Sequence, residues 1–302
     1  MNDANINQDK IVQWLVRWVE NQENVRAMIL TSSRTNPYAP IDLFSDYDVI
    51  LVVREILPFY EDKSYLGDYG EVLVVYKNPM GEDGGFAHFA DITQYEDGTK
   101  IDYSFSPVEW LRWVVEQPEL PEDLENGYIV LLDKDRLAVG LKPPTYSAFI
   151  PVPPEERVYQ DLIQEFFHES TYVAKQLWRD DLIPMKYNLD FVMKFHLLRQ
   201  MLEWRMEIDH GWSVKTGAYG KGLKKRLPPE IWSELEATYA GAGTAENWEA
   251  LYRTIAFFRK VAIQVGDRLG YEYPDELQLR VLNYLGRVEN LDQDAQTFSS
   301  FS

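Results

Sequence analysis

The chain has 302 residues, of which 45% are hydrophobic and 26% charged, the composition of a folded protein and not of a disordered one. Its 30 Lys and Arg against 49 Asp and Glu give a net charge of −19, which excludes attraction to a phosphate backbone as a general driving force, so no nucleic-acid partner is expected. The absence of cysteine excludes disulfides, thiol nucleophiles and thiolate-bound metals, and with only four histidines any metal is expected on carboxylates.

The sequence gives no sign of a membrane segment. Its longest apolar runs are far shorter than the roughly 20 residues that a membrane span requires. The N-terminus also lacks the basic and apolar pattern of a signal peptide. We therefore expect a cytoplasmic protein without a membrane partner, and the sequence indicates no particular oligomeric state.

Predicted elements in the first half are mostly strands. Apolar residues recur at helical spacing from Ile11 to Val19, which predicts an opening amphipathic helix. The Asp97-Gly98 pair predicts a hairpin, and the glycine-rich stretch 81–85 is expected to be a turn. This half should form a mixed sheet with flanking helices. Its strands are predicted over 25–30, 49–53, 72–76, 86–95 and 101–105.

The second half is predicted to be helical. A proline-rich stretch over 143–154 cannot be helix and separates the two halves. Apolar residues then follow a period near 3.6, with stripes over 158–177 and 248–262, a further helix over 189–208 and another that begins at Pro229. We expect an α+β protein with domains 1–150 and 151–290, the second a helical bundle, followed by a disordered tail over 291–302.

Acidic side chains mark a candidate site. Asp46 and Asp48 open an apolar strand, where alternate residues project from the same face, so the two carboxylates would repel one another unless a divalent cation binds them. The alternative is that they are solvated residues at the start of a strand. The hydroxyl-bearing turn 31–33 and a third carboxylate, Asp102, on a strand that the hairpin can bring alongside favour the cation.

These residues belong to a longer pattern that spans both halves. A strand that ends in a small hydroxyl turn, an Asp-x-Asp strand and a later strand acid resemble the nucleotidyltransferase superfamily. More closely, the chain resembles the bacterial aminoglycoside 6-adenylyltransferases, the streptomycin-modifying family. The stretches that carry this resemblance are, in chain order, 33–37, 46–48, 97–102, 131–135, 170–175, 197–199, 257–260 and 271–274.

The resemblance implies an activity and a cofactor. It implies transfer of AMP from ATP to a hydroxyl of an aminoglycoside such as streptomycin, by a nucleotidyltransferase-like sheet domain and a helical substrate-binding domain. Asp46 and Asp48 would hold two magnesium ions, and Asp102 would complete the shell of the second ion or accept the proton. Mg²⁺ is therefore the expected cofactor, ATP the co-substrate, and the polycationic aminoglycoside the expected partner.

The resemblance also places the nucleotide against the turn formed by Ser32, Ser33 and Arg34, with Ser33 on phosphate. One position departs from the family, which has Gly-Ser where this chain has Ser32-Ser33. Glycine at the first position lets backbone amides approach the triphosphate. The side chain of Ser32 is therefore expected to crowd that approach and weaken ATP binding, unless its backbone angles are ordinary.

A polar stripe on the first long helix of the second half offers further candidates. Glu165, His168, Tyr172 and Lys175 recur at helical spacing beside the apolar stripe. If this stripe faces the reacting groups, Lys175 would neutralise phosphate charge, and Glu165 would bind an amino group of the acceptor or act as base. The alternative is an ordinary solvated face with a contact between Glu165 and His168.

Two other functions stay open at this point. Because fold and metal site do not fix the acceptor, it could be a protein side chain, a nucleotide or another metabolite. Ser32 also leaves room for an inactive relative that only binds nucleotide. The intact trio of Asp46, Asp48 and Asp102 argues against that reading.

Overall fold

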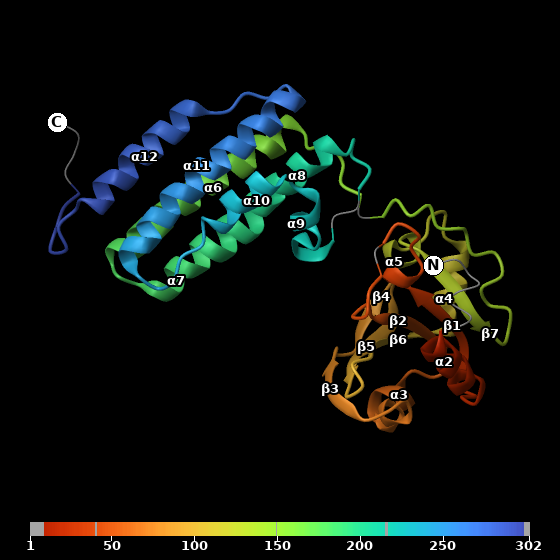
Figure 1. Ribbon diagram of the computed structural model, residues 1–302. Coiled ribbons are helices and arrows are strands. Elements are labelled where there is room, and N and C mark those ends of the chain that lie inside the picture. The colour runs from red at the N-terminus through yellow and green to blue at the C-terminus, as the bar shows by residue number, and fades with distance from the viewer. Residues whose placement is uncertain (1–8, 40, 149, 215–216, 299–302) are drawn as a thin grey trace. The chain divides into compact units, whose positions relative to one another are not determined.

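A computed structural model describes residues 9–39, 41–148, 150–214 and 217–298 (Figure 1). The chain divides into two units, Met1–Phe149 and Ile150–Ser302, the first built on a sheet and the second on helices. In the described part of the chain, none of the helices combines the length and the apolar character needed to cross a membrane.

The first helix in the described residues is α2, Lys10–Glu20, which matches the predicted amphipathic helix. Asp9 caps it by accepting hydrogen bonds from the backbone N–H groups of Ile11 and Val12, at 2.8 and 3.3 Å, and so satisfies amides that have no partner within the helix. The buried side of α2 packs on one face of the sheet.

The sheet is mixed and has seven strands, in the order β3-β5-β6-β2-β1-β7, with β4 paired to β5. The pair formed by β2 and β6 is parallel, whereas the other described pairs are antiparallel. The predicted strands are all present, and the predicted hairpin joins β5 to β6 with Gly98 at φ +88°. The bounds are β1 Val25–Thr31, β2 Tyr47–Val53, β3 Val72–Lys77, β4 Gly81–Asp83, β5 Phe86–Tyr95, β6 Lys100–Pro107 and β7 Tyr128–Asp133.

Two strands were not predicted. The segment expected to be only a turn over 81–85 contains β4, and Gly84 and Gly85, both at positive φ, make the turn into β5. A three-residue strand shows no alternation of its own, so only its partner β5 defines it. The edge strand β7 does have an apolar run, Tyr-Ile-Val-Leu-Leu, that periodicity alone could have identified.

Two hydrophobic clusters cover the two faces of the sheet. One joins α2 to alternate residues of β1 and β2, including Met28, Leu30, Val49 and Leu51. The other joins α4, Val108–Glu116, to the residues that alternate with these. Alternate residues of a strand point to the same face, and Ile50 and Val52 lie in the second cluster. The side chain of Asp48 therefore projects from the face of the sheet that carries α4. The remaining short helices of this unit are α3 Leu57–Glu61 and α5 Glu122–Glu125.

The second unit is a helical bundle around a single hydrophobic cluster, as expected. The predicted stripes lie on α6 and α11, and Pro229 is the first residue of α10. The predicted helix over 189–208 is present in two parts, a π-helix η3 that continues into α8. The bounds are α6 Glu156–Trp178, α7 Leu182–Lys186, η3 Tyr187–Leu198, α8 Arg199–Asp209, α9 Leu223–Arg226, α10 Pro229–Glu236, α11 Thr244–Leu269 and α12 Asp275–Glu289.

The predicted tail over 291–302 lies partly outside the described residues, which end at 298. Within the described part, the carbonyl of Leu291 accepts a hydrogen bond from Trp178 Nε1 at 3.0 Å. The ring of Phe298 lies 5.5 Å from that of Tyr284 on α12. Residues 291–298 are therefore non-helical chain with contacts to the helical unit.

Candidate active site

The parallel pairing of β2 with β6 brings the predicted carboxylates together. Asp48 on β2 is the register partner of Asp102 on β6. Asp46 lies one residue before β2 and has the parity of Asp48, so it belongs to the same face. Asp46 and Asp48 precede Asp102 by more than 50 residues in the sequence, yet the three carboxylates meet where the central strands β2 and β6 begin.

A lysine that the sequence analysis did not assign lies among these carboxylates. Lys100 Nζ is 2.5 Å from Asp46 Oδ2 and 2.9 Å from Asp102 Oδ2. Partial burial acts to lower the pKa of Lys100, but its hydrogen bonds to both carboxylates outweigh this and raise the pKa. The signal was present in the sequence, because Lys100 and Asp102 are two residues apart on one strand and must share a face.

Burial and mutual repulsion of the carboxylates favour the binding of a further positive charge. Burial, followed by the charges of Asp102 and Asp46, raises the pKa of Asp48 to about 6. Burial also raises the pKa of Asp102. The Oδ1 atom of Asp102 is buried, and no N–H or O–H of the described residues donates to it, which is costly for a charged oxygen.

These observations fit a magnesium site built from oxygen ligands. As the side chains lie, however, no three carboxylate or imidazole groups in the described ranges converge on one metal position. Lys100 already pairs with Oδ2 of both Asp46 and Asp102. The donor set therefore suits Mg²⁺, but its side chains must rearrange to bind the ion.

The hydroxyl turn follows β1 directly and forms the short helix η1, Ser32–Arg34. Ser32 has φ +65°, the left-handed conformation that favours glycine, so its backbone angles are not ordinary for serine. Its carbonyl accepts hydrogen bonds from the N–H groups of Thr35 and Asn36, each at 3.2 Å. The side chain of Ser32 acts to lower the pKa of Asp48, against the larger effect of burial. This turn thus supports Asp48, while the nucleotide contacts of Ser32 and Ser33 stay predictions.

Arg34 has a structural position that the sequence did not suggest. It is buried, and it donates from Nε to the carbonyl of Asp46 at 2.9 Å and from Nη2 to the carbonyl of Ser45 at 2.7 Å. Its guanidinium carbon lies 3.6 Å from the centroid of the Tyr47 ring. In this arrangement Arg34 fixes the backbone that carries Asp46, and a contact with ATP stays a prediction.

The turn is also tied to the loop before β7. The Asn36 side chain donates to both the carbonyl and the side-chain oxygen of Asn126, at 2.9 Å each. Gly127 follows with φ +127°, and a Cβ there would lie 3.2 Å from the backbone nitrogen of Asn36 and 3.1 Å from Thr35 Oγ1. Gly127 could not be identified from the sequence, because only the tertiary approach of the turn requires glycine there.

Glu165 and Lys175 belong to α6 of the helical unit, not to the unit that holds the carboxylates. The predicted polar stripe is present, since the rings of His168 and Tyr172 are 5.1 Å apart and Lys175 Nζ lies 4.1 Å from the centroid of Tyr172. Glu165 is exposed. The roles of Glu165 and Lys175 toward substrates stay predictions.

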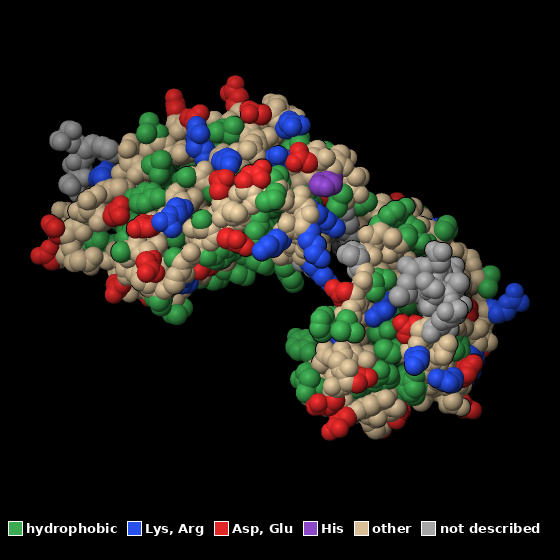
Figure 2. Space-filling view, in the orientation of Figure 1, with side chains coloured by type: hydrophobic (Ala, Val, Ile, Leu, Met, Phe, Trp, Pro, Cys, Tyr) green, Lys and Arg blue, Asp and Glu red, His purple; other side chains and the backbone are tan. Residues whose placement is uncertain are grey.

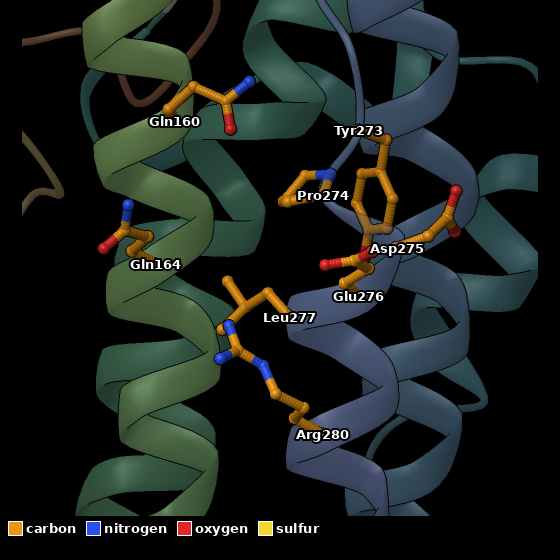
Figure 3. Close-up of a pocket in the computed structure, with 8 residues that line it drawn as sticks. All are labelled: Gln160, Gln164, Tyr273, Pro274, Asp275, Glu276, Leu277 and Arg280. Atoms are coloured by element: carbon orange, nitrogen blue, oxygen red, sulfur yellow. The ribbon is translucent and has the colours of Figure 1, made fainter.

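An open groove of about 530 Å³ lies on the helical unit between α6 and α12 (Figure 3). In Figure 3, Gln160 and Gln164 lie along α6, and Leu277 and Arg280 extend toward them from α12. Several groove residues are already partnered, as Gln160 donates to the carbonyl of Glu272 at 2.8 Å. None of the predicted site residues lines this groove, so its size alone does not make it the active site.

The fold and the site together define a class of protein. A mixed sheet carries three carboxylates beside a hydroxyl-bearing turn and is followed by helices, which is the arrangement that the resemblance to nucleotidyltransferases implied. The family model described as "Streptomycin adenylyltransferase" matches residues 6–288. The chain therefore belongs to the streptomycin adenylyltransferase family and is an enzyme of the nucleotidyltransferase class.

Individual relatives agree with this family. The chain is similar to an aminoglycoside 6-adenylyltransferase of Bacillus subtilis (strain 168), with 31% identity over 84% of this chain and 88% of the relative. It is also similar to an aminoglycoside 6-adenylyltransferase of Campylobacter jejuni, with 29% identity over 90% of this chain and 92% of the relative. A crystal structure of an aminoglycoside 6-adenyltransferase from Bacillus subtilis matches with a TM-score of 0.44 and 25% identity, and covers 94% of this chain and 99% of that one.

Proposed function

We propose that this chain transfers AMP from ATP to a hydroxyl of an aminoglycoside such as streptomycin, with magnesium held by Asp46, Asp48 and Asp102. The observation that carries this proposal is the meeting of these carboxylates on β2 and β6, in a chain of the streptomycin adenylyltransferase family. We expect the acceptor to be the 6-hydroxyl, because the relatives are aminoglycoside 6-adenylyltransferases.

In this proposal, two magnesium ions would supply positive charge to the triphosphate and lower the pKa of the attacking hydroxyl. Asp46 and Asp48 would bind these ions, and the buried Oδ1 of Asp102 would gain a ligand. The acceptor oxygen would form a new bond to the α-phosphorus while the bond to the leaving pyrophosphate breaks. The hydroxyl proton would pass to a carboxylate, for which Asp102 is the candidate in the sheet unit.

The charge of the chain suits a polycationic acceptor. A net charge of −19 raises the local concentration of small cations and speeds their arrival. On the face drawn in Figure 2, acidic side chains of the helical unit are interspersed with basic ones, so the attraction is expected to come from the whole molecule. High salt should therefore raise the KM for the aminoglycoside more than the KM for ATP.

The test is a direct assay of the transfer. Incubation with ATP, Mg²⁺ and a panel of aminoglycosides should release pyrophosphate, and mass spectrometry should find the mass of AMP added to streptomycin. NMR of the product would locate the modified hydroxyl. Asp62→Asn, a change at an exposed carboxylate beyond α3, is a matched control that should retain full activity.

Three results would contradict the proposal. Binding of ATP without pyrophosphate release for any aminoglycoside would remove this acceptor class. Labelled AMP that appears on proteins or metabolites of a cell extract would favour a different acceptor. Binding of ATP without turnover of any acceptor would favour an inactive relative.

A further inference from the structure

Lys100 lies among the carboxylates that would hold a metal. Its ammonium contacts the Oδ2 atoms of both Asp46 and Asp102, while Oδ1 of Asp102 accepts no hydrogen bond from the described part of the chain. A divalent ion bound by these carboxylates would compete with the ammonium for their negative charge. Since an ammonium and a magnesium ion repel one another, both cannot lie between Asp46 and Asp102 at once.

The backbone of Lys100 is held in the sheet, whereas its side chain is long and partly exposed. Its Cα belongs to β6, two residues before Asp102, so the strand holds its side chain on the face of the carboxylates. Its side chain is 30% exposed, and its four-carbon stem has many rotamers. Lys100 can therefore leave the carboxylates without any movement of the sheet.

A released ammonium would have a clear use beside the metal. Arg34, also cationic, already donates from Nε and Nη2 to backbone carbonyls. Its contact with the Tyr47 ring also holds it in place. Lysine binds phosphate as a mobile point charge. Lys100 is thus better placed than Arg34 to move from a carboxylate partner to a phosphate partner.

We propose that Lys100 is an exchangeable counter-cation of this site. Without metal it neutralises Asp46 and Asp102, and when Mg²⁺ binds it is displaced and pairs with a phosphate oxygen of the incoming nucleotide. This inference rests on the metal site of the proposed function. It predicts effects of opposite sign for the metal alone and for the metal with nucleotide, which a purely structural lysine would not give.

The test is a calorimetric titration of wild type and Lys100→Gln with Mn²⁺, without nucleotide. The variant lacks the competing ammonium and should bind Mn²⁺ about tenfold more tightly. With Mg²⁺ and a non-hydrolysable ATP analogue, the same variant should bind the analogue about tenfold more weakly. In EDTA its melting temperature should fall, because three carboxylates are left without a counter-charge, and Mg²⁺ should restore it.

Two further variants serve as controls. Lys77→Gln removes the same charge from an exposed position on the edge strand β3 and should bind Mn²⁺ and analogue like wild type. Lys100→Arg keeps the charge, and a guanidinium binds carboxylates through bidentate hydrogen bonds. This variant should therefore bind Mn²⁺ more weakly than wild type. If Lys100→Gln does not fold, as judged by circular dichroism, the Arg variant decides the question.

Unchanged or weaker Mn²⁺ binding by Lys100→Gln overturns the inference, as does wild-type binding by Lys100→Arg. Unchanged analogue binding by Lys100→Gln would overturn the transfer to phosphate. If neither wild type nor Lys100→Gln binds Mn²⁺, the magnesium site of the proposed function fails as well. If wild type binds Mn²⁺ and the Gln variant binds it no better, the metal site stands and only the role of Lys100 is wrong.

Discussion

At the scale of single residues, Asp48 is the centre of the candidate site. Asp46 lies two residues before it, and Asp102 is its register partner on the neighbouring strand β6. We predict that Asp46→Asn or Asp48→Asn lowers AMP transfer by about a thousandfold, because each removes a charged metal ligand. Both side chains lie where β2 begins, outside the hydrophobic clusters, so neither variant should lower the free energy of unfolding much, and Asp48→Asn should raise it near neutral pH because it removes a buried charge. Initial rates of pyrophosphate release and urea unfolding would measure the two effects. A variant that transfers at the wild-type rate would contradict the assignment.

The raised pKa of Asp48 predicts how magnesium stabilises the protein at different pH. Without metal, burial and the charges of Asp102 and Asp46 raise the pKa of Asp48 from 3.8 to about 6. The folded state then binds more protons than the unfolded chain, so the contribution of Asp48 to stability is full below 3.8 and is lost as the pH rises through 6. Mg²⁺ should offset this loss by binding the ionised form.

The increase in melting temperature caused by Mg²⁺ should therefore grow as the pH rises from about 5 to about 7. Thermal denaturation with and without MgCl₂ across this range would measure it. In Asp48→Asn, which has no proton to lose there, the pH dependence should be much flatter. An equal Mg²⁺ effect at both ends of the range in wild type would speak against Asp48 as a ligand.

Ser32 holds a conformation that glycine adopts without strain. Because φ is +65° at this position, a side chain costs about 1 kcal/mol, although the Ser32 side chain offsets part of this by its effect on Asp48. We predict that Ser32→Gly raises the free energy of unfolding by up to about 1 kcal/mol and does not weaken ATP binding. Urea unfolding and calorimetry with ATP would test this. A large loss of ATP affinity would mean that the hydroxyl has its own role in binding.

At the scale of elements, the turn after β1 depends on the loop before β7. Gly127 lies against Thr35 and Asn36 at a φ that side chains rarely adopt. We predict that Gly127→Ala destabilises the first unit by about 1–3 kcal/mol and weakens ATP binding, because the turn must move. Gly67→Ala, with no atom within 4 Å of the added Cβ, is the control for chain stiffening. Wild-type stability of Gly127→Ala would show that the loop adapts.

At the scale of the whole molecule, the chain has two units with separate hydrophobic clusters. The clusters around the sheet contain only residues of the first unit, and the large helical cluster contains only residues of the second. We predict that the two units unfold in separable calorimetric transitions, and that Mg²⁺ raises only the transition of the sheet unit, which holds Asp46, Asp48 and Asp102. Circular dichroism would assign each transition. A single transition, shifted as a whole by Mg²⁺, would contradict this prediction.

Most of the fold could be predicted from periodicity and a few punctuating residues. Alternating or continuous apolar runs predicted β1, β2, β3, β5 and β6, and stripes at a spacing of 3.6 predicted α6 and α11. Such patterns survive because each element must bury one face. The strand β4 could not be predicted, because three residues hold their conformation only through pairing with β5.

The candidate site was predictable in its residue types but not in its arrangement. Asp46, Asp48 and Asp102 could be chosen from the sequence because carboxylates that open apolar strands are costly without a cation. The position of Lys100 between two of them, the burial of Arg34 against backbone carbonyls and the left-handed angle of Ser32 could not. Each depends on segments that are distant in sequence.

The sequence by itself determined the composition, the order of the elements and the family, because these follow from the local periodicity of side chains and from stretches that match in order. Only the tertiary structure decided which charges face one another. Parallel pairing of β2 with β6 sets Asp48 opposite Asp102 and brings the ammonium of Lys100 onto both Asp46 and Asp102. Strand register joins residues far apart in the chain, and hydrogen bonds between backbones, which every residue type can make, fix that register together with the burial of the sheet's two faces.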